Sequence, residues 1–125
     1  MRTAPTTRRN LESVSWLTPI ERDAVFRFKQ RVLALAEIHV EQVLLFGSRA
    51  RGEGHEESDL DLAVILSEDE GPNWRRVVDV ATELNLEYEF RIRVSPLILS
   101  RAKLLNLWER ERAIADAIMI EGIEV

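Results

Sequence analysis

The chain has 125 residues, a formal net charge of −5 and no cysteine, with 46% hydrophobic and 31% charged residues. This composition predicts one globular domain, and it excludes disulfides, thiolate zinc sites and cysteine nucleophiles. The acidic balance argues against nucleic acid as a partner, and the apolar runs are shorter than the roughly 20 residues that cross a bilayer. Because the N-terminus also lacks the apolar segment of a secretion signal, we expect a cytoplasmic protein without a membrane partner.

The first predicted element after a polar start is a helix. Residues 1–17 are expected to form a flexible N-terminal arm, and residues 18–125 a single domain. Thr18 is suited to the N-cap, Pro19 to the first helical position and Glu21 to a capping box, so the helix should begin there. It should continue to about residue 37 and bury a stripe at helical spacing, formed by Ile20, Ala24, Phe28, Val32 and Leu35.

Two short apolar runs follow the first helix. Residues 43–46 and 63–66 are rich in strand-forming side chains and should be strands buried on both faces. The segment between them is then an exposed connection. We expect the two strands to be neighbours in one sheet.

The second half of the chain predicts helices around one more strand. A surface loop at residues 67–72 should lead into a helix that buries apolar residues between 74 and 84. A strand is predicted at about residues 87–99. A helical region broken near residues 107–111 and a short terminal strand at 123–125 should complete the chain. This order predicts an α/β (α+β) fold, in which helices cover a small central mixed β-sheet.

Two aspartates stand at the start of the second predicted strand. Asp59 and Asp61 point to the same face of an extended chain, roughly 6 to 7 Å apart. Two like charges at the edge of a core need solvent, cationic side chains or a metal ion. Mg²⁺ suits such a pair, and two ions would also polarise a phosphoryl group. The alternative interpretation is a pair of strand-entry residues neutralised by nearby arginines.

A small-residue turn ends the first predicted strand. Gly47 would let backbone N–H groups approach a phosphate, and the Ser48 hydroxyl adds a donor. Arg49 and Arg51 are candidate phosphate contacts as well. Equally, these two arginines could be solvated charges or counter-ions for the aspartates.

Together these residues resemble a known family. Gly-Ser-x-Ala-Arg-Gly, a spacer and Ser-Asp-x-Asp-Leu, within residues 47–62, are similar to the signature of minimal nucleotidyltransferases in the DNA polymerase β-like superfamily. The resemblance implies a sheet of the nucleotidyltransferase type. It also implies that Gly47 and Ser48 contact the β- and γ-phosphates of ATP or another nucleoside triphosphate. Asp59 and Asp61 would bind two Mg²⁺ ions.

The activity implied by this resemblance is transfer of a nucleoside monophosphate, AMP from ATP, to a hydroxyl with release of pyrophosphate. The implied partner is a HEPN-domain protein whose tyrosine is adenylylated by its antitoxin. The family usually has a third acid on a later strand. On the predicted strand at 87–99, Arg91 or Arg93 aligns with that acid, and Glu89 takes its place if the register shifts by one pleat. We therefore take Glu89, with Asp59 and Asp61, as a candidate catalytic residue.

A second function remains open because of the arginines. A positive charge beside the aspartates would compete with metal ions. The alternative is a catalytically weak or inactive binding module of the same fold, which neutralises a HEPN-type partner by direct contact.

Overall fold

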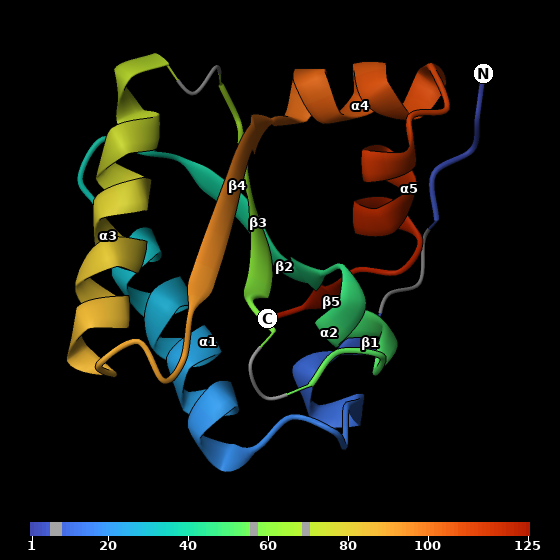
Figure 1. The fold of residues 1–125 in the computed structure, drawn as a ribbon. Coiled ribbons are helices and arrows are strands. Elements are labelled where there is room, and N and C mark those ends of the chain that lie inside the picture. Colours follow the sequence, from blue (N-terminus) through green and yellow to red (C-terminus); the bar gives the residue numbers. More distant parts are fainter. Residues whose placement is uncertain (6–8, 56–57, 69–70) are drawn as a thin grey trace.

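Five strands form one mixed sheet in the order β1-β5-β2-β3-β4, as seen in a computed structural model of the chain (Figure 1). The structure describes residues 1–5, 9–55, 58–68 and 71–125. The strands are β1 (Arg9–Asn10), β2 (Val40–Phe46), β3 (Leu60–Leu66), β4 (Val94–Ser100) and β5 (Ile123–Glu124). The helices are α1 (Pro19–Leu33), α2 (Ser48–Arg51), α3 (Trp74–Glu87), α4 (Arg101–Glu109) and α5 (Ala113–Met119). The predicted fold class is confirmed.

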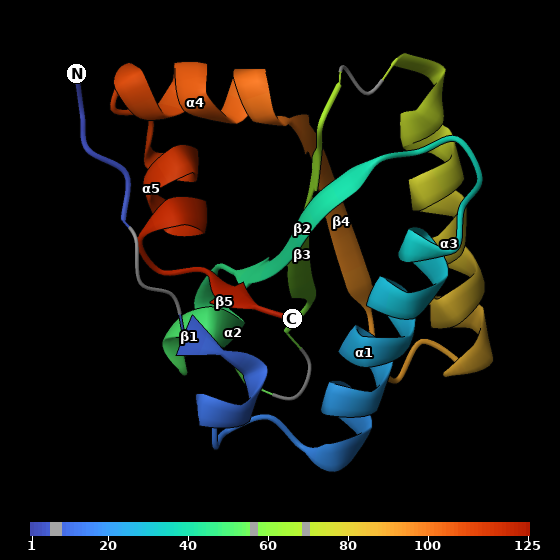
Figure 2. The same cartoon turned by 180° about the vertical axis from the view of Figure 1, so that it is seen from behind.

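Helices cover both faces of the sheet. In Figures 1 and 2, α1 and α3 lie on one side of β2, β3 and β4, and α4 and α5 lie on the other. Successive side chains of β3 alternate between the two sides: Leu62 and Val64 belong to the core under α1 and α3, whereas Ala63 and Ile65 belong to the core under α4 and α5. A side chain's parity in β3 therefore decides which helix pair it faces.

β2 and β3 are antiparallel neighbours, as the sequence predicted, but both are longer than expected. β2 begins at Val40, and β3 begins at Leu60, three residues before the predicted start. The apolar run alone marked the strand too late because Asp61 interrupts it. Asp61 therefore lies inside β3, and Asp59 directly precedes the strand.

The predicted start of α1 is confirmed by a complete capping box. The backbone N–H of Glu21 donates to Thr18 Oγ1 at 3.2 Å, and the backbone N–H of Thr18 donates to Glu21 Oε1 at 2.8 Å. The helix ends at Leu33, earlier than predicted. Ile20 is 48% exposed while Glu21 is buried, so the buried stripe differs from the prediction at its first turn.

The start of the chain packs more closely than the predicted loose arm. Residues Arg9 and Asn10 pair in parallel with β5, and both Val14 and Leu17 are buried in the core under α1. The sequence did not predict this packing, because these apolar residues stand among polar neighbours and their spacing has no regular period. The residues that begin α1 are therefore preceded by a packed segment.

The strand predicted at residues 87–99 is wrong in its first half. α3 continues to Glu87, and a turn follows in which Glu89 and Phe90 have φ angles of 54° and 59°. β4 begins only at Val94. Charged residues at alternating positions suggested an extended chain, but residues 87–90 form the end of α3 and this left-handed turn.

β4 is one of the two outer strands of the sheet, and its free edge is partly blocked. The Asn85 side chain donates to the carbonyl of Val94 at 3.0 Å and accepts from its N–H at 2.7 Å. Two residues further on, Pro96 has no N–H at all. β4 pairs in parallel with β3 through its other edge.

The C-terminal helices follow the prediction. Ser100 caps α4 by accepting from the N–H of Lys103 at 3.1 Å, and the helical region breaks between Glu109 and Ala113. β5 confirms the terminal strand. Gly122 precedes β5 at a point where a Cβ would lie 2.1 Å from the Ile118 carbonyl oxygen, so only glycine fits.

Candidate functional site

The turn after β2 brings Gly47 directly against Asp61. Gly47 has a φ of 78°, a conformation that other residues rarely adopt. A Cβ at this position would lie 2.7 Å from Asp61 Oδ2. The antiparallel register, which pairs Phe46 with Asp61, fixes this approach. The structure thus joins the predicted turn to the predicted acid pair.

Asp61 lies on the sheet face that α4 and α5 cover, because it has the same parity in β3 as Ala63 and Ile65. The side chain is partly buried. Burial, and secondarily the charge of Asp59, raise the pKa of the Asp61 carboxyl above its ordinary value. Among the described residues, this carboxylate has no hydrogen bond and no ion pair. No other described residue balances its charge by a hydrogen bond or an ion pair.

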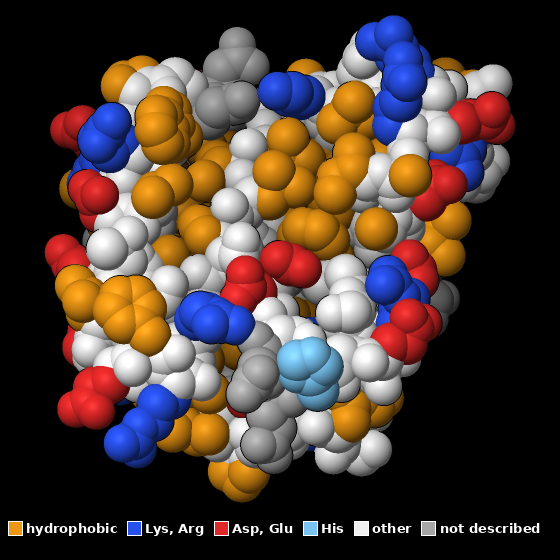
Figure 3. Space-filling model, in the orientation of Figure 1, with side chains coloured by type: hydrophobic (Ala, Val, Ile, Leu, Met, Phe, Trp, Pro, Cys, Tyr) orange, Lys and Arg blue, Asp and Glu red, His pale blue; other side chains and the backbone are white. Residues whose placement is uncertain are grey.

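Asp59 is held differently, by an arginine. Arg93 Nε donates to Asp59 Oδ1 at 2.8 Å, and both side chains are about half exposed. A backbone bond beside this pair, from the N–H of Leu60 to the carbonyl of Arg93 at 2.8 Å, fixes the two strand starts together. Figure 3 shows acidic side chains near the middle of this face, with a basic side chain beside them and an apolar area above.

The position next to the acid pair on β4 contains no carboxylate. The register pairs Asp61 with Ser95, and Arg93 precedes β4 at the level of Asp59. The alternation of side chains along the predicted strand had already indicated Arg93 as a residue beside the acid pair. Ser95 escaped notice because a single serine in an apolar strand has no pattern to distinguish it.

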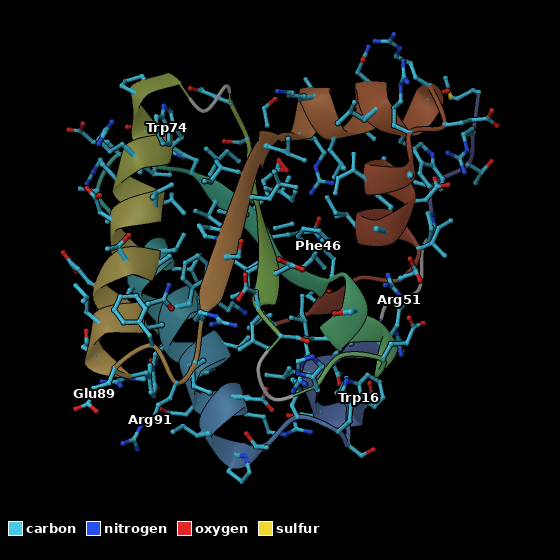
Figure 4. All side chains as sticks on the ribbon, in the orientation of Figure 1. Trp16, Phe46, Arg51, Trp74, Glu89 and Arg91 are labelled. Carbon is cyan, nitrogen blue, oxygen red and sulfur yellow. The ribbon has the colours of Figure 1, made fainter. Side chains whose placement is uncertain are left out.

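Glu89 is not brought to the acid pair. It lies in the left-handed turn after α3, is largely exposed, and approaches Arg91 at 3.7 Å. Figure 4 shows both side chains at the end of α3, pointing away from the sheet. The register shift that would have used Glu89 does not occur, since Glu89 is outside β4.

The two arginines of α2 have carboxylate partners other than the aspartates. Arg49 is buried and paired with Glu21 of α1. Arg51 Nε donates to Glu53 Oε1 at 3.2 Å, and Arg51 also lies 3.8 Å from Glu121. Among the described residues, neither arginine pairs with Asp59 or Asp61. The interpretation of both as counter-ions of the acid pair is therefore wrong.

The remaining donors at the site are those of Ser48 and the turn. Ser48 begins α2, and its hydroxyl has no hydrogen bond among the described residues. Its carbonyl accepts from the N–H groups of Glu53 and Gly54 at 3.0 and 3.4 Å, which closes the loop back on the helix. The Ser48 hydroxyl is thus free to donate to a ligand next to Gly47.

The acid pair fits a magnesium ion. Mg²⁺ is bound in proteins by one or two carboxylates together with water and substrate phosphate oxygens. Asp61 offers such a carboxylate with no partner among the described side chains, and Asp59 shares its own with Arg93. No cluster of three or more His, Cys, Asp or Glu able to bind a metal exists in the described parts of the chain. Within the described residues, the candidate ligands at this site are these two aspartates.

A family model described as Polymerase beta, Nucleotidyltransferase matches residues 30–125, which include β2, the Gly47 turn and both aspartates. The chain belongs to this nucleotidyltransferase family. The match begins within α1 and ends with the last residue, so the whole candidate site is part of the family domain.

This nucleotidyltransferase is 29% identical to "Putative protein adenylyltransferase MJ0141" of Methanocaldococcus jannaschii, over 82 residues that are 63% of this chain and 79% of the relative. A solved structure described as a toxin-antitoxin with AMP-PNP has 15% identity and a TM-score of 0.48, covering 82% of this chain and 69% of that one. A mutant of the toxin-antitoxin MntA-HpeT gives the same identity and TM-score over 83% and 70%.

No helix in the described residues of the nucleotidyltransferase has the length and apolar character needed to span a membrane.

Proposed function

We propose that this nucleotidyltransferase transfers AMP from ATP to a hydroxyl, with Mg²⁺ bound at Asp59 and Asp61. The observation that carries the proposal is the Asp61 carboxylate, which lies over Gly47 with no protein partner among the described residues. Family membership supports the reaction class, and the name of the M. jannaschii relative supports AMP as the transferred group.

The roles of the chain's own residues follow from their positions. Gly47 lets the turn approach a phosphate without a side chain in between, and the Ser48 hydroxyl donates to a phosphate oxygen. Asp61 and Asp59 bind the metal, which when present neutralises phosphate charge and favours in-line displacement. Arg93 shares Asp59 and competes with the metal for that carboxylate.

We propose that the acceptor is a hydroxyl of a partner protein, of the HEPN type that the sequence resemblance implies. The relative's name, which specifies a protein as the acceptor, supports this choice. The place beside the acid pair on β4 holds Arg93 and Ser95 instead of a carboxylate. We therefore propose that the acceptor's proton is taken by water or by a group of the partner, and that Glu89 has no part in this step.

The test is transfer of label from [α-³²P]ATP to a HEPN-domain partner in the presence of Mg²⁺. The wild type should label the partner, and Asp61→Asn should not, while Asp79→Asn on the exposed side of α3 should behave as the wild type. Absence of label with the wild type, together with absence of Mg²⁺-dependent ATP binding by calorimetry, would reject the proposal.

A second candidate function is a binding module that inhibits the same partner by contact. The observation that favours it is the Arg93–Asp59 ion pair, which occupies one of the two metal ligands. Under this function the partner forms an equally tight complex with the wild type and with Asp61→Asn, and neither labels it. Size-exclusion chromatography of the two mixtures, run beside the labelling assay, separates the two candidates.

A further inference from the structure

The helix that follows the phosphate turn is too short to hold its own shape. α2 has four residues, Ser48–Arg51, whereas isolated helices shorter than about 12 residues are marginal in water. The last carbonyls of a helix also need hydrogen-bond donors from outside its own backbone ladder. The β2–β3 register fixes the approach of Gly47 to Asp61, but the order of α2, and of the turn from which it starts, therefore also depends on the groups that bind the far end of α2.

Trp16 supplies one of these groups. Its indole N–H donates to the carbonyl of Arg49 at 2.6 Å. The same ring lies against the glycine that ends α2: a Cβ on Gly52 would be 3.3 Å from it. Figure 4 shows Trp16 beside α2, in the N-terminal segment that the chain passes through before α1. One side chain thus contacts both the helix and its C-terminal turn.

Two further side chains bind α2, one from the same segment and one from the first turn of α1. Arg9 donates to the carbonyl of Ala50 at 3.3 Å and to that of Glu121 at 3.1 Å. Glu21, at the start of α1, forms the buried ion pair with Arg49. The carbonyls of Arg49 and Ala50, which α2 cannot satisfy internally, are therefore satisfied by residues that precede α1.

We propose that Trp16 is a positioning residue for nucleotide binding, which acts by holding α2 and with it the Gly47–Ser48 turn. This inference rests on the proposed function, because it assigns a nucleoside triphosphate to that turn. Trp16 contacts the far end of α2 and not the turn itself. Its effect is preorganisation: the turn is ordered before the phosphates arrive, so binding does not have to order it.

The experiment compares Trp16→Phe with Trp74→Phe in the full chain. Phenylalanine keeps an aromatic ring against Gly52 but removes the N–H donor. Trp74 is a matched control, since it is a partly exposed tryptophan on α3, outside the α2 contacts. Amide hydrogen exchange of residues 47–54 is measured without ligand, and the Kd for ATP with Mg²⁺ is measured by calorimetry well below the unfolding temperature.

We expect Trp16→Phe to increase exchange in residues 47–54 and to weaken ATP binding roughly two- to tenfold, the effect of one lost hydrogen bond. Trp74→Phe should change neither. A purely structural role of Trp16 would lower the unfolding temperature and leave the Kd unchanged, and that result overturns the inference while the proposed function stands. If the wild type itself binds no ATP, both are overturned, and the exchange data then report only on the packing of α2.

Discussion

Asp61 Oδ2 lies only 2.7 Å from the position that a Cβ on Gly47 would take. This contact links the end of β2 to the start of β3, and it places a carboxylate over the only residue of the turn with no side chain. The candidate site depends on this relationship more than on any other pair of residues.

Gly47→Ala should therefore lower stability and abolish ATP binding. The positive φ costs about 1–2 kcal/mol for a residue with a Cβ, and the Asp61 carboxylate has to turn away from the new methyl group, out of its place over the turn. Urea unfolding gives the free energy of unfolding, and calorimetry gives the binding. Gly71→Ala is the matched control, since Gly71 also has a positive φ of 43° but no atom within 4 Å of its Cβ position. Equal losses for both variants would show that the Asp61 contact is unimportant.

Asp61→Asn should leave the ligand-free protein as stable as the wild type or more stable. The pKa of Asp61 is raised in the folded state, so at neutral pH its charge is less favourable there than in the unfolded chain. Asparagine removes this cost and also removes the metal ligand. Thermal unfolding should thus show no stabilisation of Asp61→Asn by ATP with Mg²⁺, whereas the wild type gains about 2.7 kcal/mol at one hundred times Kd. A wild-type-like ligand response of the variant would contradict the metal site.

Arg93→Gln should reduce the Mg²⁺ concentration needed for half-maximal ATP binding, because Asp59 is then no longer shared. The ion pair is half exposed, so its loss should cost only about 0.2–1 kcal/mol of stability. Titration of Mg²⁺ at constant ATP measures the effect. Arg91→Gln is the control, with a largely exposed guanidinium that approaches Glu89 and not the acid pair. A higher Mg²⁺ requirement would instead assign Arg93 to phosphate binding.

Glu21→Gln should be among the most destabilising single changes outside the apolar core. The substitution keeps a side chain that completes the capping box, but it leaves the buried Arg49 charge without its partner, at a cost of about 3–5 kcal/mol. Chemical denaturation measures the loss. Glu87→Gln breaks an exposed pair with Arg31 and should have a much smaller effect. Similar losses for the two variants would mean that burial of the Arg49 pair contributes nothing.

Local sequence signals predicted the parts of the fold that depend on local chemistry. The capping box of Thr18 and Glu21, the Ser100 cap and the neighbouring strands β2 and β3 are all confirmed. The turn after α3 was missed because two non-glycine residues, Glu89 and Phe90, adopt the left-handed conformation there. Main-chain bonds hold them in a conformation that their own preferences oppose: the N–H of Glu89 donates to the Leu86 carbonyl at 3.0 Å, and that of Phe90 to the Asn85 carbonyl at 2.9 Å.

For the site, the sequence indicated which residues carry candidate functional groups, but not which charged side chains pair with one another. Gly47 and Asp61 were expected together and lie together. Arg49 is paired with Glu21, 28 residues away in the chain, and no local pattern connects the two. This buried ion pair forms only because α1 and α2 meet in the folded chain. No periodic pattern in a single sequence indicates that the two helices meet.

The partly blocked edge of β4 limits the addition of a further strand to this sheet. Asn85 takes both main-chain groups of Val94, and Pro96 offers no donor, so β4 is a poor template for strand addition. A protein that presents a hydroxyl to Asp59 and Asp61 is therefore not expected to bind by adding a strand to β4. The same blocked edge protects copies of this chain from stacking edge to edge into longer sheets.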